Sequence, residues 1–207
     1  MQLIDKDFCD LVRLAVADAV AFIKNERAVF NMDAVEYKGV NDLVSYVDKT
    51  AEKIIVDALL KLIPDAGFIT EENTINVSDK EYCWIIDPLD GTTNFIHGLN
   101  FYCVSVGLMY KNELVLGVVH EVNLNECFYA WKGGGAYCNG ERIMVSATTH
   151  LSQSLIATGF PYTNYDRMES YMRVFDYCMR NTHGLRRLGS AAVRSEEHTS
   201  ELQSRVD

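Results

Sequence analysis

The sequence WIIDPLDGTTNF, residues 84–95, places two carboxylates directly after an apolar stretch. Pro88 and Gly91 predict a turn between and after them, so that Asp87 and Asp90 can converge on one point. Mg²⁺ binds through one or two such carboxylates together with water and phosphate oxygens. Residues 91–94 then offer small side chains and backbone N–H groups, as a helix N-terminus that holds a phosphate does. The stretch therefore predicts a metal site beside a phosphate site.

Other sites built on closely spaced aspartates do not fit this stretch. An EF-hand loop needs the pattern D-x-[DN]-x-[DN]-G, which Pro88 and the spacing break. A haloacid-dehalogenase nucleophile needs D-x-D-x-T, which is also absent. A plain Asx-turn is an alternative for any Asp-Gly pair, but the context of all of residues 84–95 favours the metal and phosphate interpretation.

Two amphipathic helices are predicted before this stretch. Apolar residues recur at helical spacing from Asp7 to about Lys24 and again from about Ser45 to Leu62. Ser45 fits the N-cap of the second helix, and Pro64 fits its end. Asp48 then lies in the first turn of that helix.

After these helices the pattern changes to short β runs separated by turn residues such as Asn139-Gly140. The runs predict an antiparallel sheet of about six strands, at residues 67–70, 82–86, 102–110, 114–122, 126–131 and 142–146. Together with the two helices they predict an α+β fold.

A second pattern begins at residue 151, with a strand at 154–158, a helix at about 166–180 and a strand at 185–188. We therefore divide the chain into an α+β metal- and phosphate-binding domain, residues 1–150, and the start of an α/β domain, residues 151–193. Residues 194–207 are polar except for the large apolar residues Leu202 and Val206. The segment resembles translated sequencing-adapter sequence. We interpret it as a non-native tail.

Composition limits the classes of partner. Among the 207 residues, 19 are Lys or Arg and 29 are Asp or Glu, so the net charge of −10 disfavours nucleic acid and anionic membrane as partners. No apolar run approaches the roughly 18 residues of a membrane span, and the N-terminus lacks the features of a signal peptide. The six cysteines form no C-x-x-C pair, which predicts reduced core residues in the cytoplasm.

Residues 84–95 closely resemble the signature W-[IV]-[IV]-D-P-[IL]-D-G-T-T-N-F of the inositol monophosphatase family. Four further segments resemble family motifs in the expected order: D-L-V-T-x-x-D at Asp42–Asp48, an acidic segment at Phe68–Glu72, G-x-G-A-[FY]-x-N-G at Gly134–Gly140, and R-x-[LV]-G-[ST]-A-A at Arg187–Ala192. The resemblance covers about residues 5–193. It implies the layered αβαβα sugar-phosphatase fold, with the α/β half incomplete.

The resemblance also implies a cofactor, Mg²⁺, and a role for each matching residue. A first metal would be held by Glu71, Asp87 and the Leu89 carbonyl, and a second by Asp87 and Asp90. The catalytic group would be Asp48, Thr92 and Glu71, with Asp48 and Thr92 orienting the attacking water. Substrate would be bound by Asp90, Gly91, Thr92, Thr93 and Ala191.

One departure from the family is clear in the sequence. The family continues past its G-[ST]-A-A junction to a W-D-x-A-A-G motif, whose Asp completes the second metal site. This chain has no such motif. The resemblance therefore implies a family member that is truncated in its C-terminal domain and impaired in activity.

The function implied is a Mg²⁺-dependent phosphomonoesterase that hydrolyses myo-inositol monophosphate or a similar polyol phosphate by metal-activated water. Hydrolysis of phosphate monoesters is very slow without a catalyst, and paired metals both activate water and neutralise charge. Fructose-1,6-bisphosphatase and histidinol-phosphatase are alternatives, whereas bisphosphate nucleotidases usually show D-G-T-K-[ED]-F instead. An inactive metal-binding fragment is an alternative of another class. Lithium sensitivity, a homodimer when full length and a cytoplasmic location are further expectations.

Overall fold

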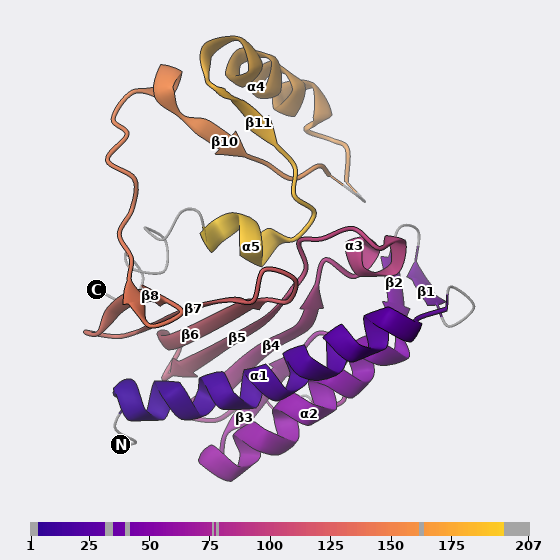
Figure 1. Ribbon diagram of the computed structural model, residues 1–207, viewed down its shortest axis with the longest axis vertical. Coiled ribbons are helices and arrows are strands. Elements are labelled where there is room, and N and C mark those ends of the chain that lie inside the picture. The colour runs from indigo at the N-terminus through magenta and orange to yellow at the C-terminus, as the bar shows by residue number, and fades with distance from the viewer. Residues whose placement is uncertain are drawn as a thin grey trace.

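The computed structural model describes residues 4–31, 35–39, 42–75, 77, 79–161 and 164–196. Two long helices lie side by side across one face of a large sheet, and a smaller helical and β unit lies over the opposite face (Figure 1). The layered α and β architecture agrees with the fold expected from the sequence.

The two N-terminal helices form where the sequence predicts them. Helix α1 (Lys6–Val29) begins at the N-cap Asp5, whose side chain accepts a hydrogen bond from the Phe8 backbone N–H. Helix α2 (Tyr46–Leu62) begins with a capping box, in which Ser45 is the N-cap and Asp48 the third helical residue. Between the helices, strands β1 (Val35–Gly39) and β2 (Asp42–Ser45) pair in an antiparallel hairpin that the sequence patterns did not predict.

The main sheet has seven strands in the order of the chain. They are β3 (Gly67–Thr70), β4 (Tyr82–Asp90), β5 (Cys103–Tyr110), β6 (Glu113–Glu121), β7 (Glu126–Trp131), β8 (Gly135–Cys138) and β9 (Glu141–Arg142). All neighbours from β4 to β9 are antiparallel, as predicted.

Three details of the sheet differ from the prediction. Strand β8 was not predicted, and it pairs with β7 in antiparallel fashion. The pair β3 and β4 is parallel, because the chain returns along the outer edge of β3, where Val77 bridges Phe68 in antiparallel fashion. The strand predicted at 142–146 ends at Arg142, since Ile143 makes one more backbone hydrogen bond to the Ala136 carbonyl and the chain then leaves the sheet edge. Met144 and Val145 are 81% and 47% exposed, so the apolar side chains of this segment do not pack into the core.

The main core lies between α1, α2 and the sheet. Among its largest fully buried side chains are Trp84 and Phe68 from the strands, Ile23 from α1 and Ile55 from α2. Phe8 stacks on Trp84 with ring centroids 6.4 Å apart. The described residues contain all six cysteines, and none of the six forms a disulfide.

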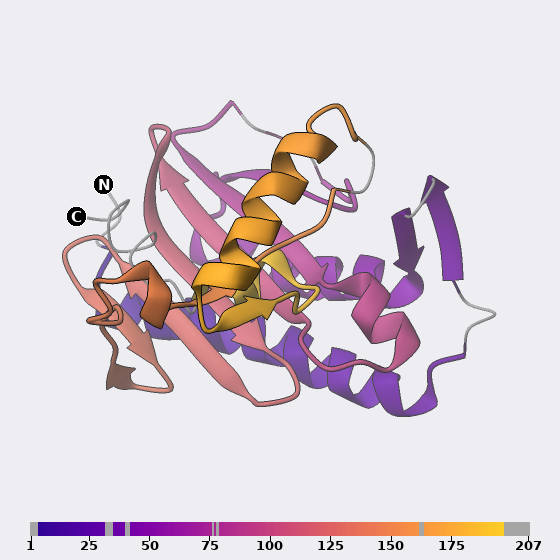
Figure 2. The same cartoon turned by 90° about the horizontal axis from the view of Figure 1, so that it is seen from above.

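The C-terminal unit contains α4 (Met168–Asn181) and the parallel strands β10 (Leu155–Ala157) and β11 (Gly184–Arg186), preceded by a 3₁₀ turn, η2 (Leu151–Gln153). Figure 2 shows α4 crossing the sheet on the side opposite α1 and α2. Helix α5 (Ala191–Glu196) lies between this unit and the sheet, where Val193 packs with Cys103 and Val119. Of residues 194–207, which are expected to form a non-native tail, 194–196 belong to α5 and 197–207 lie outside the described residues.

No helix within these ranges combines the length and apolar character that a membrane crossing requires.

Candidate active site

The predicted site residues come from five elements whose ends meet at one side of the sheet. Strands β3 and β4 end there in parallel, and α2, α3 (Thr92–His97) and α5 all begin there. Gly91 allows the sharp change from β4 to α3, because it has φ 98°, a left-handed conformation that favours glycine.

Asp48 and Thr92 form the centre of this arrangement. The Asp48 side chain is 2% exposed, and its Oδ2 accepts hydrogen bonds from the Ser45 backbone N–H at 2.9 Å and the Ser45 hydroxyl at 2.7 Å. The Thr92 hydroxyl lies 3.0 Å from Asp48 Oδ1 and 3.0 Å from the Leu89 carbonyl oxygen, so its single proton bonds one at a time or is shared. Burial raises the pKa of Asp48 and outweighs these hydrogen bonds.

Glu71 and Asp87 form an acidic pair beside this centre. Glu71 follows directly after β3, and its backbone N–H donates to the Ile86 carbonyl at 3.2 Å, which places Glu71 next to Asp87 on β4. Burial, then the negative charges of Glu71 and Asp90, raise the pKa of Asp87 well above its usual range. The carboxylates of Glu71 and Asp90 therefore both act on Asp87 at the end of β4.

Asp90 faces the start of α5. Its Oδ2 accepts hydrogen bonds from the Ser190 hydroxyl at 2.6 Å and the Ala192 backbone N–H at 2.5 Å. Of the other residues predicted to bind substrate, Gly91 and Thr92 are partly buried at the start of α3, whereas Thr93 and Ala191 are exposed. The structure thus brings the Asp87–Thr92 segment and the Ser190–Ala192 junction together from opposite ends of the chain.

The donor set fits a hard cation, although no three His, Cys, Asp or Glu side chains in the described ranges are grouped in the arrangement that encloses a metal ion. The candidate ligands are all oxygens: the carboxylates of Glu71, Asp87 and Asp90 and the Leu89 carbonyl. The pKa of Asp87 is raised by burial and then by the negative charges of Glu71 and Asp90. A divalent cation bound there would balance the charge that a proton otherwise balances.

Two residues of this site were missed by the sequence reasoning. Glu52, on α2, is fully buried and accepts hydrogen bonds from the loop that follows Glu71. The Asn94 side-chain amide lies within hydrogen-bonding distance of the carbonyl oxygens of Asn100, Phe101 and Leu188, at 3.1, 2.9 and 2.8 Å. The only local signal for Glu52 is a carboxylate next to the apolar stripe of α2. Asn94 belongs to the motif at residues 84–95, but no role was assigned to it from the sequence.

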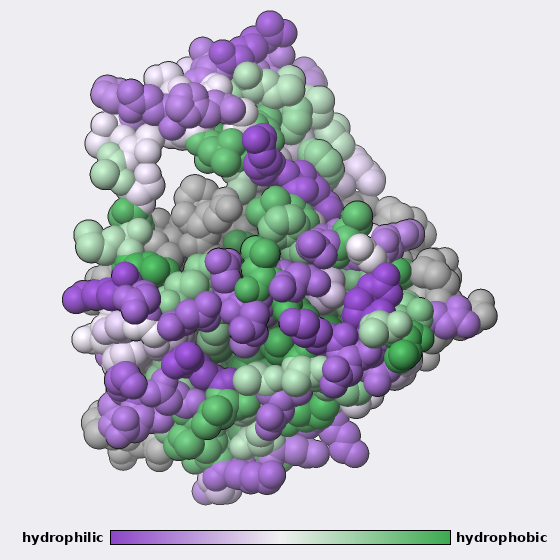
Figure 3. All heavy atoms as spheres, in the orientation of Figure 1, coloured by the Kyte–Doolittle hydropathy of each residue, from purple (hydrophilic) through white to green (hydrophobic). Residues whose placement is uncertain are grey.

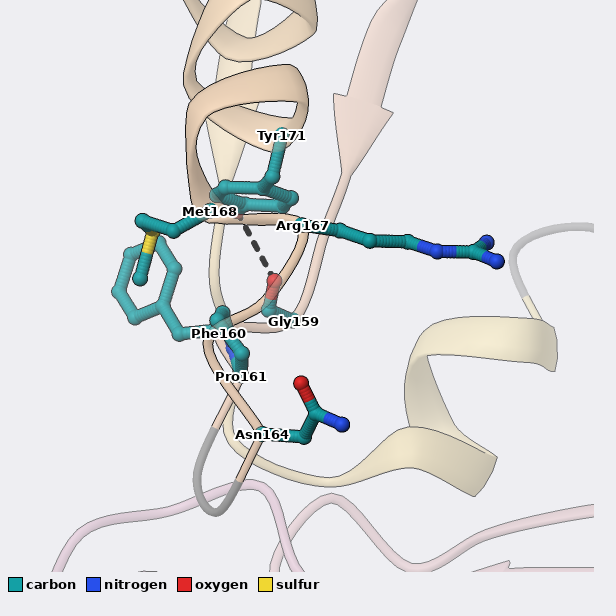
Figure 4. A pocket seen from close by; sticks show the side chains of 7 residues that line it. All are labelled: Gly159, Phe160, Pro161, Asn164, Arg167, Met168 and Tyr171. Atoms are coloured by element: carbon teal, nitrogen blue, oxygen red, sulfur yellow. Dashed lines mark hydrogen bonds between the residues drawn. The ribbon is translucent and has the colours of Figure 1, made fainter.

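A separate cavity of about 290 Å³ lies in the C-terminal unit and contains none of the predicted residues. Its lining is Gly159, Phe160, Pro161, Asn164, Arg167, Met168 and Tyr171 (Figure 4). The Tyr171 hydroxyl donates to the Gly159 carbonyl at 2.9 Å across this lining, and the Arg167 side chain extends away from it. We therefore place the candidate active site at the end of β4 and not in this cavity.

Several known proteins are similar to this chain. A fructose-1,6-bisphosphatase/inositol-1-monophosphatase of Aquifex aeolicus is 35% identical over 188 residues, which are 91% of this chain and 71% of that protein. An inositol-1-monophosphatase of Rhizobium meliloti is 40% identical over 77% of this chain and 60% of its own length. A Nus factor SuhB of Salmonella typhimurium is 40% identical over 78% of this chain and 61% of its own length. The chain thus spans only part of these relatives.

Solved structures show the same similarity. The extragenic suppressor protein suhB of Bartonella henselae superposes with a TM-score of 0.83 at 35% identity, covering 89% of this chain and 71% of that one. An IMPase of Thermotoga maritima superposes with a TM-score of 0.81 at 33% identity, covering 91% and 71%. Residues 7–195 match the sequence profile of the inositol monophosphatase family. This chain is therefore a member of the inositol monophosphatase family.

Proposed function

We propose that this chain carries the phosphate- and metal-binding half of a Mg²⁺-dependent phosphomonoesterase, which hydrolyses myo-inositol monophosphate or a similar polyol phosphate to the polyol and inorganic phosphate. Membership of the family supports a phosphatase. The observation that carries the proposal is the pairing of the buried Asp48 carboxylate with the Thr92 hydroxyl at 3.0 Å, beside the acidic group at the end of β4.

Asp48 and Thr92 have the geometry to orient a water molecule. Ser45 fixes the Asp48 carboxylate with two hydrogen bonds, and the other oxygen of that carboxylate accepts from Thr92. When the Thr92 proton is directed at Asp48, the lone pairs of the Thr92 oxygen are left to accept from water. The raised pKa of Asp48 makes its carboxylate a better proton acceptor. Hydrolysis then joins the water oxygen to phosphorus as the water proton passes through Thr92 to Asp48. The bond from phosphorus to the polyol oxygen breaks, and that oxygen takes a proton from solvent water.

We assign metal binding to the three carboxylates at the end of β4, those of Glu71, Asp87 and Asp90. Glu71, Asp87 and the Leu89 carbonyl would hold one Mg²⁺, and Asp87 with Asp90 would contribute to a second. When bound, Mg²⁺ lowers the pKa of water and neutralises charge on the phosphoryl oxygens. The substrate would lie toward Gly91, Thr92, Thr93, Asp90 and Ala191.

The names of the relatives leave the substrate class broader than inositol phosphate. One relative carries both fructose-1,6-bisphosphatase and inositol-1-monophosphatase in its name. A 2′-AMP-bound structure of SaIMPase-II has a TM-score of 0.72 at 26% identity with this chain. We favour a polyol phosphate because the family name and several relatives carry inositol monophosphate.

The test is phosphate release from myo-inositol 1-phosphate, fructose 1,6-bisphosphate, histidinol phosphate and 2′-AMP, with and without Mg²⁺, beside calorimetric titration of Mg²⁺. Asp87→Asn is the matched variant, since it keeps the size of the side chain and removes its charge. In a protein that carries the W-D-x-A-A-G segment, we expect Mg²⁺-dependent turnover that Asp87→Asn abolishes, whereas the 207-residue chain should show weak turnover or none. Mg²⁺ binding without turnover would indicate the inactive metal-binding fragment instead, and absence of both would overturn the proposal.

A cytoplasmic location, a homodimer and lithium sensitivity belong to the same proposal and rest on the resemblance to the family. Lithium inhibition is expected only in a protein that carries a W-D-x-A-A-G segment, because the second metal site depends on that Asp. Inhibition of the 207-residue chain at the same lithium concentration would contradict this.

A further inference from the structure

We propose that Glu52 is a positioning residue that holds residues 71–75, here called the acidic loop, so that Glu71 reaches the metal site. The inference rests on the proposed function, because it concerns the same site. Glu52 lies on α2 and does not itself belong to the candidate ligands.

Within the described part of the chain, the hydrogen bonds found for the Glu52 carboxylate all come from the acidic loop. One carboxylate oxygen, Oε2, accepts from the Glu72 backbone N–H at 2.8 Å. The other, Oε1, accepts from the Thr74 backbone N–H at 2.9 Å and the Thr74 hydroxyl at 2.5 Å. Both oxygens are therefore used, and all three donors come from a segment of three residues.

Burial explains why these contacts matter. Glu52 has 0% exposure, and a buried carboxylate is stable only when hydrogen bonds replace its hydration. The acidic loop supplies three such bonds, so releasing the loop leaves the carboxylate without them. Opening of the loop is therefore opposed by the loss of these three hydrogen bonds to a buried carboxylate. Such charge-assisted bonds are stronger than hydrogen bonds between neutral groups.

Within the loop the Asn73 side-chain amide donates to the Glu71 carbonyl at 3.2 Å. Two further hydrogen bonds lie at the ends of the loop. At the first end the Glu71 backbone N–H donates to the Ile86 carbonyl at 3.2 Å, and at the other the Thr70 hydroxyl donates to the Ile75 carbonyl at 2.9 Å. Glu52 adds the bonds from α2 to the middle of the loop. Without it, Glu71 would keep its attachment to β4 but lose the support that follows it directly in the chain.

Helix α2 then sets both sides of the candidate site. Asp48, in its first turn, contacts Thr92, and Glu52, one turn further on, holds the loop that carries Glu71. A single rigid element therefore fixes the distance between the water-orienting pair and the acidic pair.

The variant Glu52→Gln separates this role from packing. Glutamine has nearly the same shape, but it offers one acceptor oxygen, and its NH₂ group would face a backbone N–H of Glu72 or Thr74. At least one bond to the loop is lost. Asp57→Asn is the matched control, because Asp57 is an exposed carboxylate on the same helix. Thr74→Val removes a hydroxyl of the loop without changing α2, and it serves if Glu52→Gln does not fold.

The experiment compares these variants in the 207-residue chain by Mg²⁺ titration calorimetry, by hydrogen–deuterium exchange of residues 71–75 without Mg²⁺, and by thermal unfolding. Replacing a residue that orients a metal ligand typically weakens metal affinity about 10- to 100-fold. We expect a loss of this size in Glu52→Gln, a smaller one in Thr74→Val and none in Asp57→Asn, with faster exchange of the loop in the first two.

A merely structural role would lower the melting temperature and leave Mg²⁺ affinity unchanged, which would overturn the inference. Equal exchange of the loop in Glu52→Gln and the wild type would overturn it as well. If the wild-type chain binds no Mg²⁺, the metal assignment of the proposed function fails, and the exchange contrast alone decides whether Glu52 positions the loop.

Discussion

At the scale of single residues, Asp48 serves both a helix end and the candidate site. One oxygen of its carboxylate completes the capping box with Ser45, and the other faces the Thr92 hydroxyl. Because the capping bonds fix the side-chain orientation, Thr92 meets an acceptor whose position does not depend on substrate. Such a preformed pair is what orientation of a water molecule requires.

The first prediction concerns Thr92. In a protein that carries the W-D-x-A-A-G segment, Thr92→Ala removes the hydroxyl and should lower turnover by about 100-fold or more, the range typical of lost general-base assistance. Thr92→Ser keeps the hydroxyl and should retain most of the rate. Both are measured as Mg²⁺-dependent phosphate release, on whichever substrate of the panel is turned over. If Thr92→Ala kept more than about a tenth of the rate, a barrier change below ~1.4 kcal/mol, the assignment of Thr92 would be wrong.

His120 gives a prediction about pH. The residue is 7% exposed, its buried Nδ1 has no hydrogen-bond partner among the described residues, and burial lowers its pKa. The neutral form is therefore favoured by folding. The stability that depends on it should be present in full above pH about 6.5 and be lost as pH falls toward the folded-state pKa.

The measurement is urea unfolding at several pH values between 5 and 8, with His120→Gln as the comparison. The wild type should lose stability on acidification over this range more steeply than the variant. Parallel pH profiles for the two proteins would show that His120 does not titrate as its burial predicts.

At the scale of elements, Asn94 joins α3 to the segment that leads into α5. Its amide contacts the Leu188 carbonyl across 94 positions of sequence. The next residue, Gly189, has φ 103°, and a Cβ placed there would lie 2.3 Å from the Asn94 amide nitrogen. The absence of a side chain at 189 therefore lets the two elements approach.

The element-scale prediction compares Gly189→Ala with Gly133→Ala. Both glycines have positive φ, so each alanine meets backbone strain of about 1–2 kcal/mol. Only at 189 does the new Cβ also meet Asn94, since nothing lies within 4 Å of the corresponding position at 133. Overpacking adds about 1–3 kcal/mol. Hydrogen exchange of the Ala192 and Val193 amides should therefore accelerate about tenfold or more in Gly189→Ala and not in Gly133→Ala.

The same comparison of elements shows what local sequence patterns can reveal. The spacing of apolar residues predicts α1, α2 and most strands, and the motif at 84–95 leads to Asp87, Asp90 and Thr92. The parallel pairing of β3 with β4 depends on the return of the chain through Val77, and the contact from Asn94 to Leu188 depends on tertiary packing. Neither leaves a periodic signal. Glu52 was missed for a related reason, because its loop partners, Glu72 and Thr74, lie 20 and 22 positions further along the chain.

At the scale of the whole molecule, the two halves of the chain are packed very differently. The N-terminal half has a continuous core between α1, α2 and the sheet. In the C-terminal unit no residue of α4 is buried, and β10 and β11 form a sheet of only two strands, a size that is marginal without further packing. Figure 3 shows apolar atoms at the surface in the upper part of the molecule, beside an opening between that part and the rest.

The last prediction follows from this exposed α4 surface. Val174 and Tyr177 are 63% and 56% exposed and lie three residues apart, on the same side of the helix. Apolar residues gathered in this way favour association, which removes them from water. The double variant Val174→Glu with Tyr177→Glu should therefore shift the chain toward monomer, measured by light scattering after size exclusion over a range of concentrations. Leu124→Glu is the control, since Leu124 is 58% exposed in the turn between β6 and β7 and does not belong to α4. A wild-type chain that stays monomeric throughout, or an equal effect of the control, would show that α4 does not drive association.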